Sequence, residues 1–409
     1  MRNILILGGL FLFCLTVNAQ TESGLVAHYF FDGNLLDARG NAINEGIPME
    51  TPTYGCGIVN QSLQFNGGSS EVRFDGQVNN EFNNTEDFTV SLYFKPDVAN
   101  GEMYLLSKRR FNCEPNNSFY IKYQAASNAV NVYLEEDNGR IINILAQLSL
   151  SQCWHHIVVT RNSGNVRVYG DGRFLAERST LGRIDLMSEG NLILGSSDCF
   201  VGNEIPFNGV IDEMRVYNRA LNENEIRDLY LAPEQIATQD TVIFLGNPVP
   251  IELTANCAVA FSWFPETGVS TPSGATPNIS PVFEGDYTYT VQMRDGASSC
   301  IATDSIQITV VDPSSLDCSE AYVPNTFTPN NDGINDEFGL SNPFAIPEMI
   351  SFEVFDRWGS RVFGTSDPFQ RWDGSYQGKP VNPGVMQYRV RYICRDEELE
   401  RFGTVMIMR

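Results

Sequence analysis

Positive charge is scarce in this 409-residue sequence. It holds 27 Lys and Arg side chains against 50 Asp and Glu, which gives a formal net charge of -23 at pH 7. Binding to the phosphates of nucleic acid requires clustered cations. The composition therefore excludes a nucleic-acid-binding protein. Charged residues make up only 19% of the chain and aromatic residues 11%, a mixture that favours strands and turns over long helices.

Histidine is nearly absent, and the cysteines lack the spacing of a metal site. The only histidines are His28, His155 and His156, and no Cys-x-x-Cys pair occurs. A structural zinc site takes its ligands from histidines and closely spaced cysteines. The sequence thus excludes such a site, and any bound metal would have to use oxygen ligands.

Long hydrophobic runs are missing beyond the N-terminus. Arg2 precedes the apolar run Ile4–Phe13, and small residues stand at positions -3 and -1 before Gln20. About a dozen apolar residues are too few to span a hydrocarbon core of about 30 Å. We therefore interpret residues 1–19 as a cleaved signal peptide and expect an exported mature chain without a transmembrane segment.

Eight cysteines remain in the mature chain, and an even number in an exported protein favours disulfides. They are Cys56, Cys113, Cys153, Cys199, Cys257, Cys300, Cys318 and Cys394.

Proline and charge divide the chain into three segments. Pro233 and Pro313 mark two linkers, and the stretch between them is almost devoid of positive charge. Composition shifts and prolines of this kind are typical of domain boundaries. The predicted domains are 20–232, 233–317 and 318–409.

The first segment contains many short runs of alternating apolar and polar residues, such as Phe88–Phe94, Val130–Leu134 and Val166–Tyr169, separated by turn residues. This pattern predicts an antiparallel all-β sandwich or barrel. One helix is expected over 222–230, where Asn222 can cap the first turn.

Histidines 155 and 156 follow Trp154 on a predicted strand. Successive side chains of a strand face opposite ways, so the two histidines cannot both face one site. We expect Trp154 and one histidine to pack inside the sandwich and the other histidine to be exposed, with catalysis by them as the less favoured alternative.

Six blocks of the first segment resemble the laminin-G-like domain of the concanavalin A-like lectin and glucanase superfamily. They are GLVAHYFFDGNLLDARGN (24–41), SLQFNGGSSEVRF (62–74), DFTVSLYFK (87–95), CWHHIVVTR (153–161), VRVYGDG (166–172) and FNGVIDEMRVYNRALNENEIRDLY (207–230). The resemblance implies a two-sheet antiparallel jelly roll that binds carbohydrate or protein and often carries a structural Ca²⁺ ion.

Calcium ligands are the first residues implied by this resemblance. Asp32, Asp37 and Asp212 are the acids nearest the family's calcium positions, and Ca²⁺ prefers several carboxylate and carbonyl oxygens. The alternative is structural: Asp32 begins an Asp-Gly-Asn turn and Asp37 is a loop acid.

An enzyme of the same superfamily is an alternative to a binding protein. The glucanases of this fold carry Glu-x-Asp-x-x-Glu on a strand, because glycoside hydrolysis requires two carboxyl groups about 5–10 Å apart. That pattern is absent here, and Glu135-Glu136-Asp137 runs into Asn138-Gly139, which indicates a hairpin tip. We therefore expect no enzymatic activity.

The ligand surface is expected at a stapled pair of loops. The stretches SKRRFNC (107–113) and LGSSDC (194–199) resemble neighbouring loops of related domains, which implies a Cys113–Cys199 disulfide and leaves Cys56 to pair with Cys153. Arg109, Arg110, Phe111 and Phe200 would then gather at one edge. Arginine and aromatic side chains suit a glycan ligand, although ordinary loop decoration is the alternative.

The middle segment has the order Cys257, Trp263, Cys300. It resembles immunoglobulin-like or polycystic-kidney-disease-type (PKD) repeats, which implies a β-sandwich in which the tryptophan lies against a disulfide between these two cysteines. We interpret it as an acidic spacer.

The third segment resembles the type B sorting domain of the type IX secretion system, also called the gliding-motility-associated C-terminal domain. The matching stretches are VPNTFTPNNDGINDEF (323–338), FEVFDRWGSRVF (352–363), WDGSYQGKPVNPGVMQYRV (372–390) and the final FGTVMIMR. The resemblance implies a small β-sandwich that an outer-membrane translocon recognises. We expect Trp358 and Trp372 in its core and a Cys318–Cys394 disulfide.

Together these features predict a secreted or cell-surface protein, without enzymatic activity, that recognises carbohydrate or glycoprotein through its first domain. A polysaccharide-degrading enzyme and a structural adhesin without a soluble glycan ligand are the alternatives.

Overall fold

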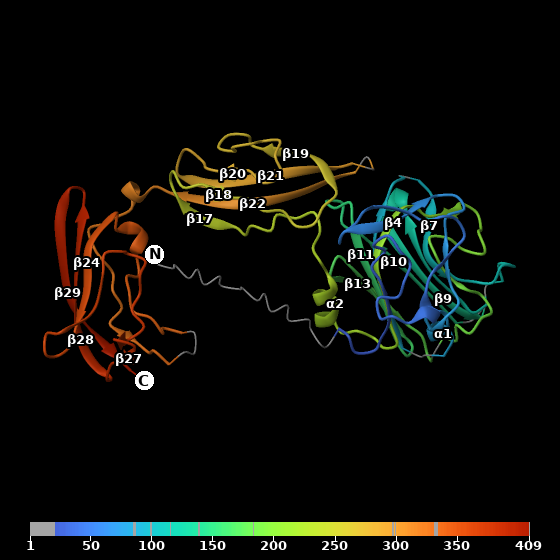
Figure 1. Cartoon of the computed structure of the whole chain (residues 1–409), viewed down its shortest axis with the longest axis horizontal. Helices are drawn as coiled ribbons and strands as arrows, with labels where there is room; N and C mark the ends of the chain where they lie inside the picture. Colours follow the sequence, from blue (N-terminus) through green and yellow to red (C-terminus); the bar gives the residue numbers. More distant parts are fainter. Residues whose placement is uncertain are drawn as a thin grey trace, which may run out of the picture.

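The computed structural model describes residues 21–84, 87–98, 100–114, 116–137, 140–182, 184–296, 298, 300–330 and 334–408. The predicted signal peptide and the predicted Asn138-Gly139 hairpin tip lie outside these residues. Figure 1 shows three β-rich parts arranged in a row. We call them the first unit (21–232), the middle unit (233–317) and the third unit (318–408).

The first unit contains two eight-stranded sheets. The first sheet consists of β1 (Leu25–Tyr29), β3 (Thr53–Cys56), β4 (Gln61–Asn66), β6 (Phe88–Pro96), β11 (His155–Asn162), β12 (Asn165–Gly170), β13 (Arg173–Ser179) and β16 (Asn208–Tyr217). The second sheet consists of β2 (Ile47–Pro48), β5 (Val72–Phe74), β7 (Glu102–Lys108), β8 (Ser118–Gln124), β9 (Ala129–Asp137), β10 (Arg140–Gln147), β14 (Leu192–Leu194) and β15 (Glu204–Pro206). Among the described residues of this unit, the strand pairings are antiparallel except that of β15 with β7. The predicted all-β jelly-roll sandwich is confirmed.

Alternation along the strands builds the core of this sandwich. On β8, Phe119 and Ile121 join the central hydrophobic cluster, whereas Tyr120 and Lys122 face away from it. Side chains of a strand face opposite sides with period two, so one set fills the space between the sheets and the other forms an outer surface.

Two helices accompany the sandwich, α1 (Gln77–Asn84) and α2 (Glu223–Leu229). The predicted capping of α2 is confirmed: the Asn222 side chain accepts hydrogen bonds from the amides of Asn224 and Glu225, and the Glu225 carboxylate accepts one from the Asn222 amide. Ile226 and Leu229 of this helix pack on the outer side of the first sheet, against Val158 and Tyr169. The helix thus covers part of that sheet.

The middle unit has a four-stranded sheet of β17 (Thr241–Phe244), β22 (Ile301–Val311), β21 (Gly285–Asp295) and β19 (Ala258–Phe264), together with the pair β18 (Val249–Pro250) and β20 (Asn278–Ile279). Strand β17 runs parallel to β22. Trp263 is buried, and its indole nitrogen donates a hydrogen bond to the Gly274 carbonyl oxygen at 2.9 Å.

Two disulfide predictions are wrong. Cys56 pairs with Cys257 and Cys153 pairs with Cys300, each with a Cα–Cα distance of 5.8 Å. The expected Cys56–Cys153 and Cys257–Cys300 bridges therefore do not form. The physical reason is that the end of the middle unit holding the β21–β22 connection lies against the first unit, where the amide of Thr303 donates a hydrogen bond to the Ser151 carbonyl oxygen at 2.9 Å.

The third unit is built on the sheet β23 (Thr326–Phe327), β29 (Glu397–Ile407), β28 (Gly384–Cys394), β24 (Glu348–Phe355) and β25 (Arg361–Thr365), with the pair β26 (Ser375–Tyr376) and β27 (Lys379–Pro380). Cys318 and Cys394 form a disulfide, as expected. Trp372 is buried in the core, but the prediction that Trp358 also lies there is wrong, because its side chain is 83% exposed. It stands on the turn between β24 and β25, where the Asp356 carboxylate accepts the amides of Trp358 and Ser360.

Candidate ligand-binding site

Polar and aromatic side chains line the outer face of the second sheet. We define the tyrosine face by seven residues that share this face: Tyr104, Tyr120, Lys122, Asn131, Tyr133, Glu135 and Asn143. The strand register places Tyr120 opposite Tyr133, and Tyr133 opposite Asn143. Lys122 lies between Tyr104 and Asn131 in the neighbouring row. The face therefore crosses β7, β8, β9 and β10.

The rings of this face are held in fixed positions. Tyr120 and Tyr133 stack with centroids 4.8 Å apart and planes inclined by 6°. The Lys122 ammonium lies 5.0 Å from the Tyr120 ring centroid, and the Arg109 guanidinium lies 5.2 Å from the same centroid. Cations over a ring face attract its negative quadrupole. The Tyr120 ring is thus fixed by both tyrosine stacking and cation contacts.

Ion pairs adjoin the rings. The Lys122 Nζ contacts Glu102 Oε2 and Glu204 Oε1, each at 2.8 Å. The hydroxyl of Tyr104 donates to Glu204 Oε2 at 2.6 Å and accepts from Arg109 Nη1 at 2.6 Å. Together these contacts form a closed polar network in which each carboxylate has a cationic or hydroxyl partner.

Burial and pairing shift the pKa values in this network. Burial opposes ionisation of Glu204, but hydrogen bonds from Lys122 and Tyr104 outweigh it and lower the pKa of the Glu204 carboxyl. Burial likewise opposes the charge on Lys122, and hydrogen bonds to Glu102 and Glu204 outweigh it and raise the pKa of the Lys122 ammonium. Both groups are therefore charged at neutral pH.

The β9–β10 side of the tyrosine face is open to solvent. Tyr133 is partly exposed, Asn143 is exposed, and the flanking Ile141 and Leu145 are 43% and 58% exposed. A ring and an amide in one cross-strand row, flanked along β10 by two apolar side chains, can stack on a sugar ring and bond its hydroxyls, because aromatic faces suit apolar surfaces and amides donate and accept.

The four predicted ligand residues lie at one edge of this region, and they differ in how accessible they are. The Cys113–Cys199 disulfide forms as expected. Arg109 is only 8% exposed, bound to Tyr104 and Glu204, while Phe200 packs edge-on against Tyr104 with centroids 5.6 Å apart and stays 40% exposed. Phe111 is 83% exposed, and Arg110 pairs with Glu114 at 3.8 Å. Arg109 thus supports the site from within, and the two phenylalanines are the accessible members.

Sequence reasoning missed the tyrosines. Tyr120 and Lys122 alternate with Phe119 and Ile121, and Tyr133 alternates with Val132. This alternation shows that they share an outward face, but the register across four strands is what brings them together.

The three predicted calcium ligands serve as hydrogen-bond acceptors in two places. Asp32 accepts the Gln61 amide at 2.9 Å and Asp212 accepts the Ile58 amide at 2.7 Å, so both hold the β3–β4 hairpin. Asp37 accepts the His28 amide at 3.1 Å. In the part of the chain that the structure describes, no group of three or more His, Cys, Asp or Glu side chains is placed to hold a metal ion. Calcium stays a prediction.

The expectation of one buried and one exposed histidine is wrong, because His155 and His156 are both buried. They do face opposite sides: His155 contacts the Phe94 ring, whereas His156 stacks on Tyr93 and Tyr230. Strand β11 is covered on both sides because Tyr230, at the end of α2, covers its outer side. Burial lowers the pKa of His156 to about 3, so this imidazole stays neutral.

Two carboxyl groups have pKa values raised by burial, Asp212 (to about 8) and Glu234. Asp212 accepts the amides of Ile58, Val59 and Glu213, and Glu234 accepts those of Cys153 and Trp154. Both are less than 5% exposed. They hold the backbone and do not line the tyrosine face.

Two family models match parts of the chain. Residues 66–227 match the concanavalin A-like lectin/glucanases superfamily, and residues 321–407 match the CHU_C Type IX secretion signal domain. The middle unit is not separately matched. No curated protein matches the sequence. Among the described residues, no helix is both long and apolar enough to pass through a membrane.

Several solved structures are similar to the chain at low identity. Domain 4 of AbnA, a GH43 extracellular arabinanase from Geobacillus stearothermophilus, is 22% identical with a TM-score of 0.41, covering 50% of this chain and 98% of that one. The CBM40 of a Ruminococcus gnavus IT-sialidase is 16% identical with a TM-score of 0.35, covering 46% and 96%. The receptor binding domain of botulinum neurotoxin D is 11% identical with a TM-score of 0.43, covering 68% and 74%. Similarity at this level carries no information about the ligand.

Proposed function

We propose that this chain, which contains a concanavalin A-like domain over 66–227 and a type IX secretion signal domain over 321–407, is a non-enzymatic protein that binds carbohydrate or glycoprotein through the tyrosine face. The secretion signal domain indicates export to the cell surface or the extracellular space. The middle unit then acts as a spacer that is joined covalently to the binding unit by two disulfides.

One observation carries the binding proposal: the stacked Tyr120–Tyr133 pair continues into the exposed Asn143 in a single cross-strand row. The contacts of Lys122 and Arg109 with the Tyr120 ring preorganise the row. A site whose rings are already fixed pays little ordering entropy when a ligand binds.

The carboxyl chemistry favours binding over hydrolysis. Glycoside cleavage requires a protonated carboxyl group that the substrate can reach, with a second carboxylate nearby. Glu102 and Glu204 of the network are each held by Lys122, and the pKa of Glu204 is lowered. Glu135 is 3% exposed and accepts the Tyr133 hydroxyl at 2.7 Å. None of these is suited to be the proton donor.

The proposed function is tested by presenting the full-length, disulfide-bonded chain to a broad glycan array, with and without Ca²⁺. We expect binding to a defined set of glycans and no release of shortened products from them. Release of products would favour the enzyme. Silence of the array together with retained adhesion of cells to surfaces would favour the structural adhesin and contradict the proposal.

Export by the type IX system is tested separately in the producing bacterium. Deletion of residues 318–409 removes the whole third unit, whose core and Cys318–Cys394 disulfide lie within it. We expect the truncated chain to accumulate in the periplasm. Unchanged appearance at the surface or in the medium would contradict the assignment of the tag.

A further inference from the structure

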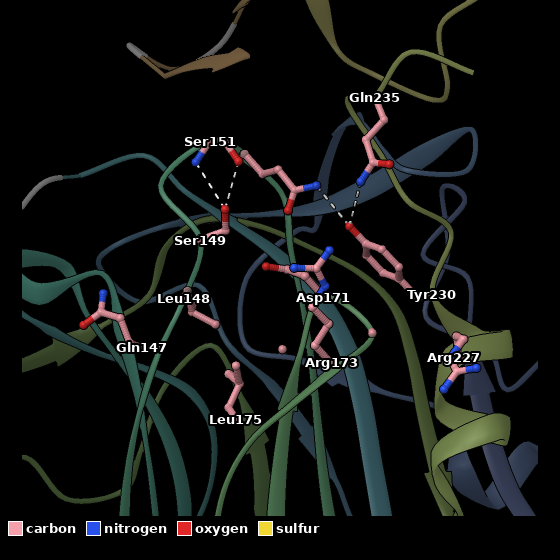
Figure 2. A pocket seen from close by; sticks show the side chains of 13 residues that line it. Gln147, Leu148, Ser149, Ser151, Asp171, Arg173, Leu175, Arg227, Tyr230 and Gln235 are labelled. Carbon is pink, nitrogen blue, oxygen red and sulfur yellow. Dashed lines mark hydrogen bonds between the residues drawn. The ribbon is translucent and has the colours of Figure 1, made fainter. Parts of the chain in front are cut away.

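A cavity of about 600 Å³ lies where the first unit meets the segment leading into the middle unit. Figure 2 shows the side chains that line it. They come from the end of β10 and the loop that follows it (147–152), the β12–β13 hairpin (170–175), the end of α2 and Gln235. A volume of this size accommodates a small organic ligand such as one or two sugar residues.

Tyr230 forms one wall of the cavity. Its hydroxyl oxygen accepts hydrogen bonds from Gln152 Nε2 at 3.0 Å and from Gln235 Nε2 at 3.3 Å. Burial raises the pKa of Tyr230 to about 12, so the phenol keeps its proton at neutral pH. Because two amides already fill its acceptor positions, the hydroxyl can still donate its own hydrogen to a ligand.

Tyr230 packs closely against the β12–β13 hairpin. Gly172 has a φ of +72°, and a Cβ at this position would lie 2.9 Å from the Tyr230 ring. Only glycine allows both this backbone conformation and this close approach. The cavity is thus built by a glycine turn packed against an aromatic ring.

Two arginines line the cavity and lack an acidic partner. Arg173 comes from the hairpin and Arg227 from α2, and in the view of Figure 2 they lie on either side of Tyr230. Within the described part of the chain neither forms an ion pair, although other arginines of this unit, including Arg73 and Arg219, do. In a protein of net charge -23, exposed arginines without a carboxylate partner are available to an anionic ligand.

The acid of the cavity, Asp171, is already engaged. Its Oδ1 accepts the His156 amide at 2.9 Å, and its Oδ2 lies 3.4 Å from His155 Nδ1. Its carboxylate is therefore bonded to strand β11. The remaining polar lining consists of amides and hydroxyls, among them Gln147 and Ser149. Gln147 Nε2 donates to the carbonyl oxygens of Ser127 and Asn128, and the Ser149 hydroxyl is hydrogen-bonded to that of Ser151. The side-chain oxygens of Gln147 and Ser149 can still accept hydrogen bonds from sugar hydroxyls.

We propose that this cavity binds an acidic sugar, with the carboxylate held by Arg173 and the sugar hydroxyls held by the Tyr230 hydroxyl and by the side-chain oxygens of Gln147 and Ser149. This site is separate from the tyrosine face and goes beyond the proposed function, because it recognises a charged sugar residue by its carboxylate.

The test is isothermal titration of the full-length, disulfide-bonded protein with glucuronate and galacturonate, and with glucose and galactose as neutral counterparts. We expect saturable binding of at least one uronate that weakens as salt is raised, and at least about tenfold weaker binding of the matching neutral sugar. Arg173→Gln should weaken uronate binding about tenfold. Arg178→Gln, an exposed arginine of the same strand outside the cavity, should leave it unchanged.

Several outcomes would overturn the proposal: no uronate binding, equal binding of acidic and neutral sugars, or uronate binding that survives Arg173→Gln. Acetate that binds as tightly as the uronates would reduce the cavity to a simple anion site and equally refute it. Glycan binding by the tyrosine face serves as the folding control, because Arg173→Gln should still bind those glycans as the parent chain does. Loss of glycan binding alone would refute the proposed function and leave the acidic-sugar site standing.

Discussion

The buried ion pair between the first and middle units makes a quantitative prediction about their coupling. Lys95 lies on β6 and Asp295 at the end of β21. The Lys95 Nζ contacts the two Asp295 carboxylate oxygens at 2.5 and 2.8 Å, and both side chains are no more than 5% exposed. Lys95 also lies 5.2 Å from the Trp154 ring centroid. The pair is therefore desolvated on all sides.

Removing one partner of such a pair leaves an uncompensated buried charge. Lys95→Met should lower the free energy of unfolding by about 3–5 kcal/mol. We expect the first and middle units to melt together, because two disulfides and the buried ion pair join them. For a unit of about 300 residues this loss corresponds to a fall of roughly 5–8 °C in the melting temperature. The double variant Lys95→Met/Asp295→Leu should recover at least half of the loss, because no charge is then left buried.

Calorimetry of the full-length, disulfide-bonded chain measures this, and Lys379→Met, an exposed lysine of the third unit, is the control for substitution as such. The reasoning is refuted if Lys95→Met shifts the transition no more than the control does. It is equally refuted if the losses of the two single variants simply add in the double variant.

Two further predictions follow from the same region. The pKa of His156 is about 3 in the folded chain and about 6.5 in the unfolded chain. Between these values only the unfolded chain binds the proton, so the free energy of unfolding rises with pH. It should fall by roughly 2 kcal/mol from pH 6.5 to pH 5. In denaturant titrations the free energy of unfolding of His156→Gln should fall by about 2 kcal/mol less than that of the parent chain over the same pH interval. A pH dependence equal to that of the parent chain would contradict the assignment of this effect to His156. Mass spectrometry of an unreduced digest should recover peptides joined as Cys56–Cys257 and Cys153–Cys300, and peptides joining Cys56 to Cys153 would show the cross-unit pairing to be wrong.

Much of the secondary structure could be predicted from the sequence, because the strand and helix patterns of the first unit agree with its structure. Alternation over Phe88–Phe94 and Val130–Leu134 predicted strands that become β6 and β9. The Asn222–Glu225 spacing predicted the start of α2. Such signals act over a few residues and require no knowledge of distant contacts.

The disulfide pattern could not be predicted in the same way. Each unit near the junction contributes two cysteines, and pairing within a unit is as consistent with the spacing as pairing between units. The pairing is decided by which cysteines come within a Cα–Cα distance near 5.8 Å, and the packing of the middle unit on the first sets those distances. The exposure of Trp358 could not be predicted for the same reason, because a tryptophan in a turn is buried only where another part of the chain covers the turn.

The candidate site was predicted in part. The loops joined by Cys113–Cys199 were identified, and Phe200 does lie against the site. The Tyr120–Tyr133 row was missed because its two members are 13 positions apart and meet only through the β8–β9 register. Arg109 was identified for an exposed role, whereas burial gives it a supporting one.

Glycan binding by the tyrosine face is tested by comparing Tyr133→Ala with the parent chain. The titration uses the array glycan that binds best, and Phe174→Ala, an exposed ring on the other sheet, is the matched control. We predict roughly tenfold weaker binding for Tyr133→Ala, since the variant loses its stacking surface, and no change for Phe174→Ala. Equal affinity of Tyr133→Ala and the parent chain would contradict the claim.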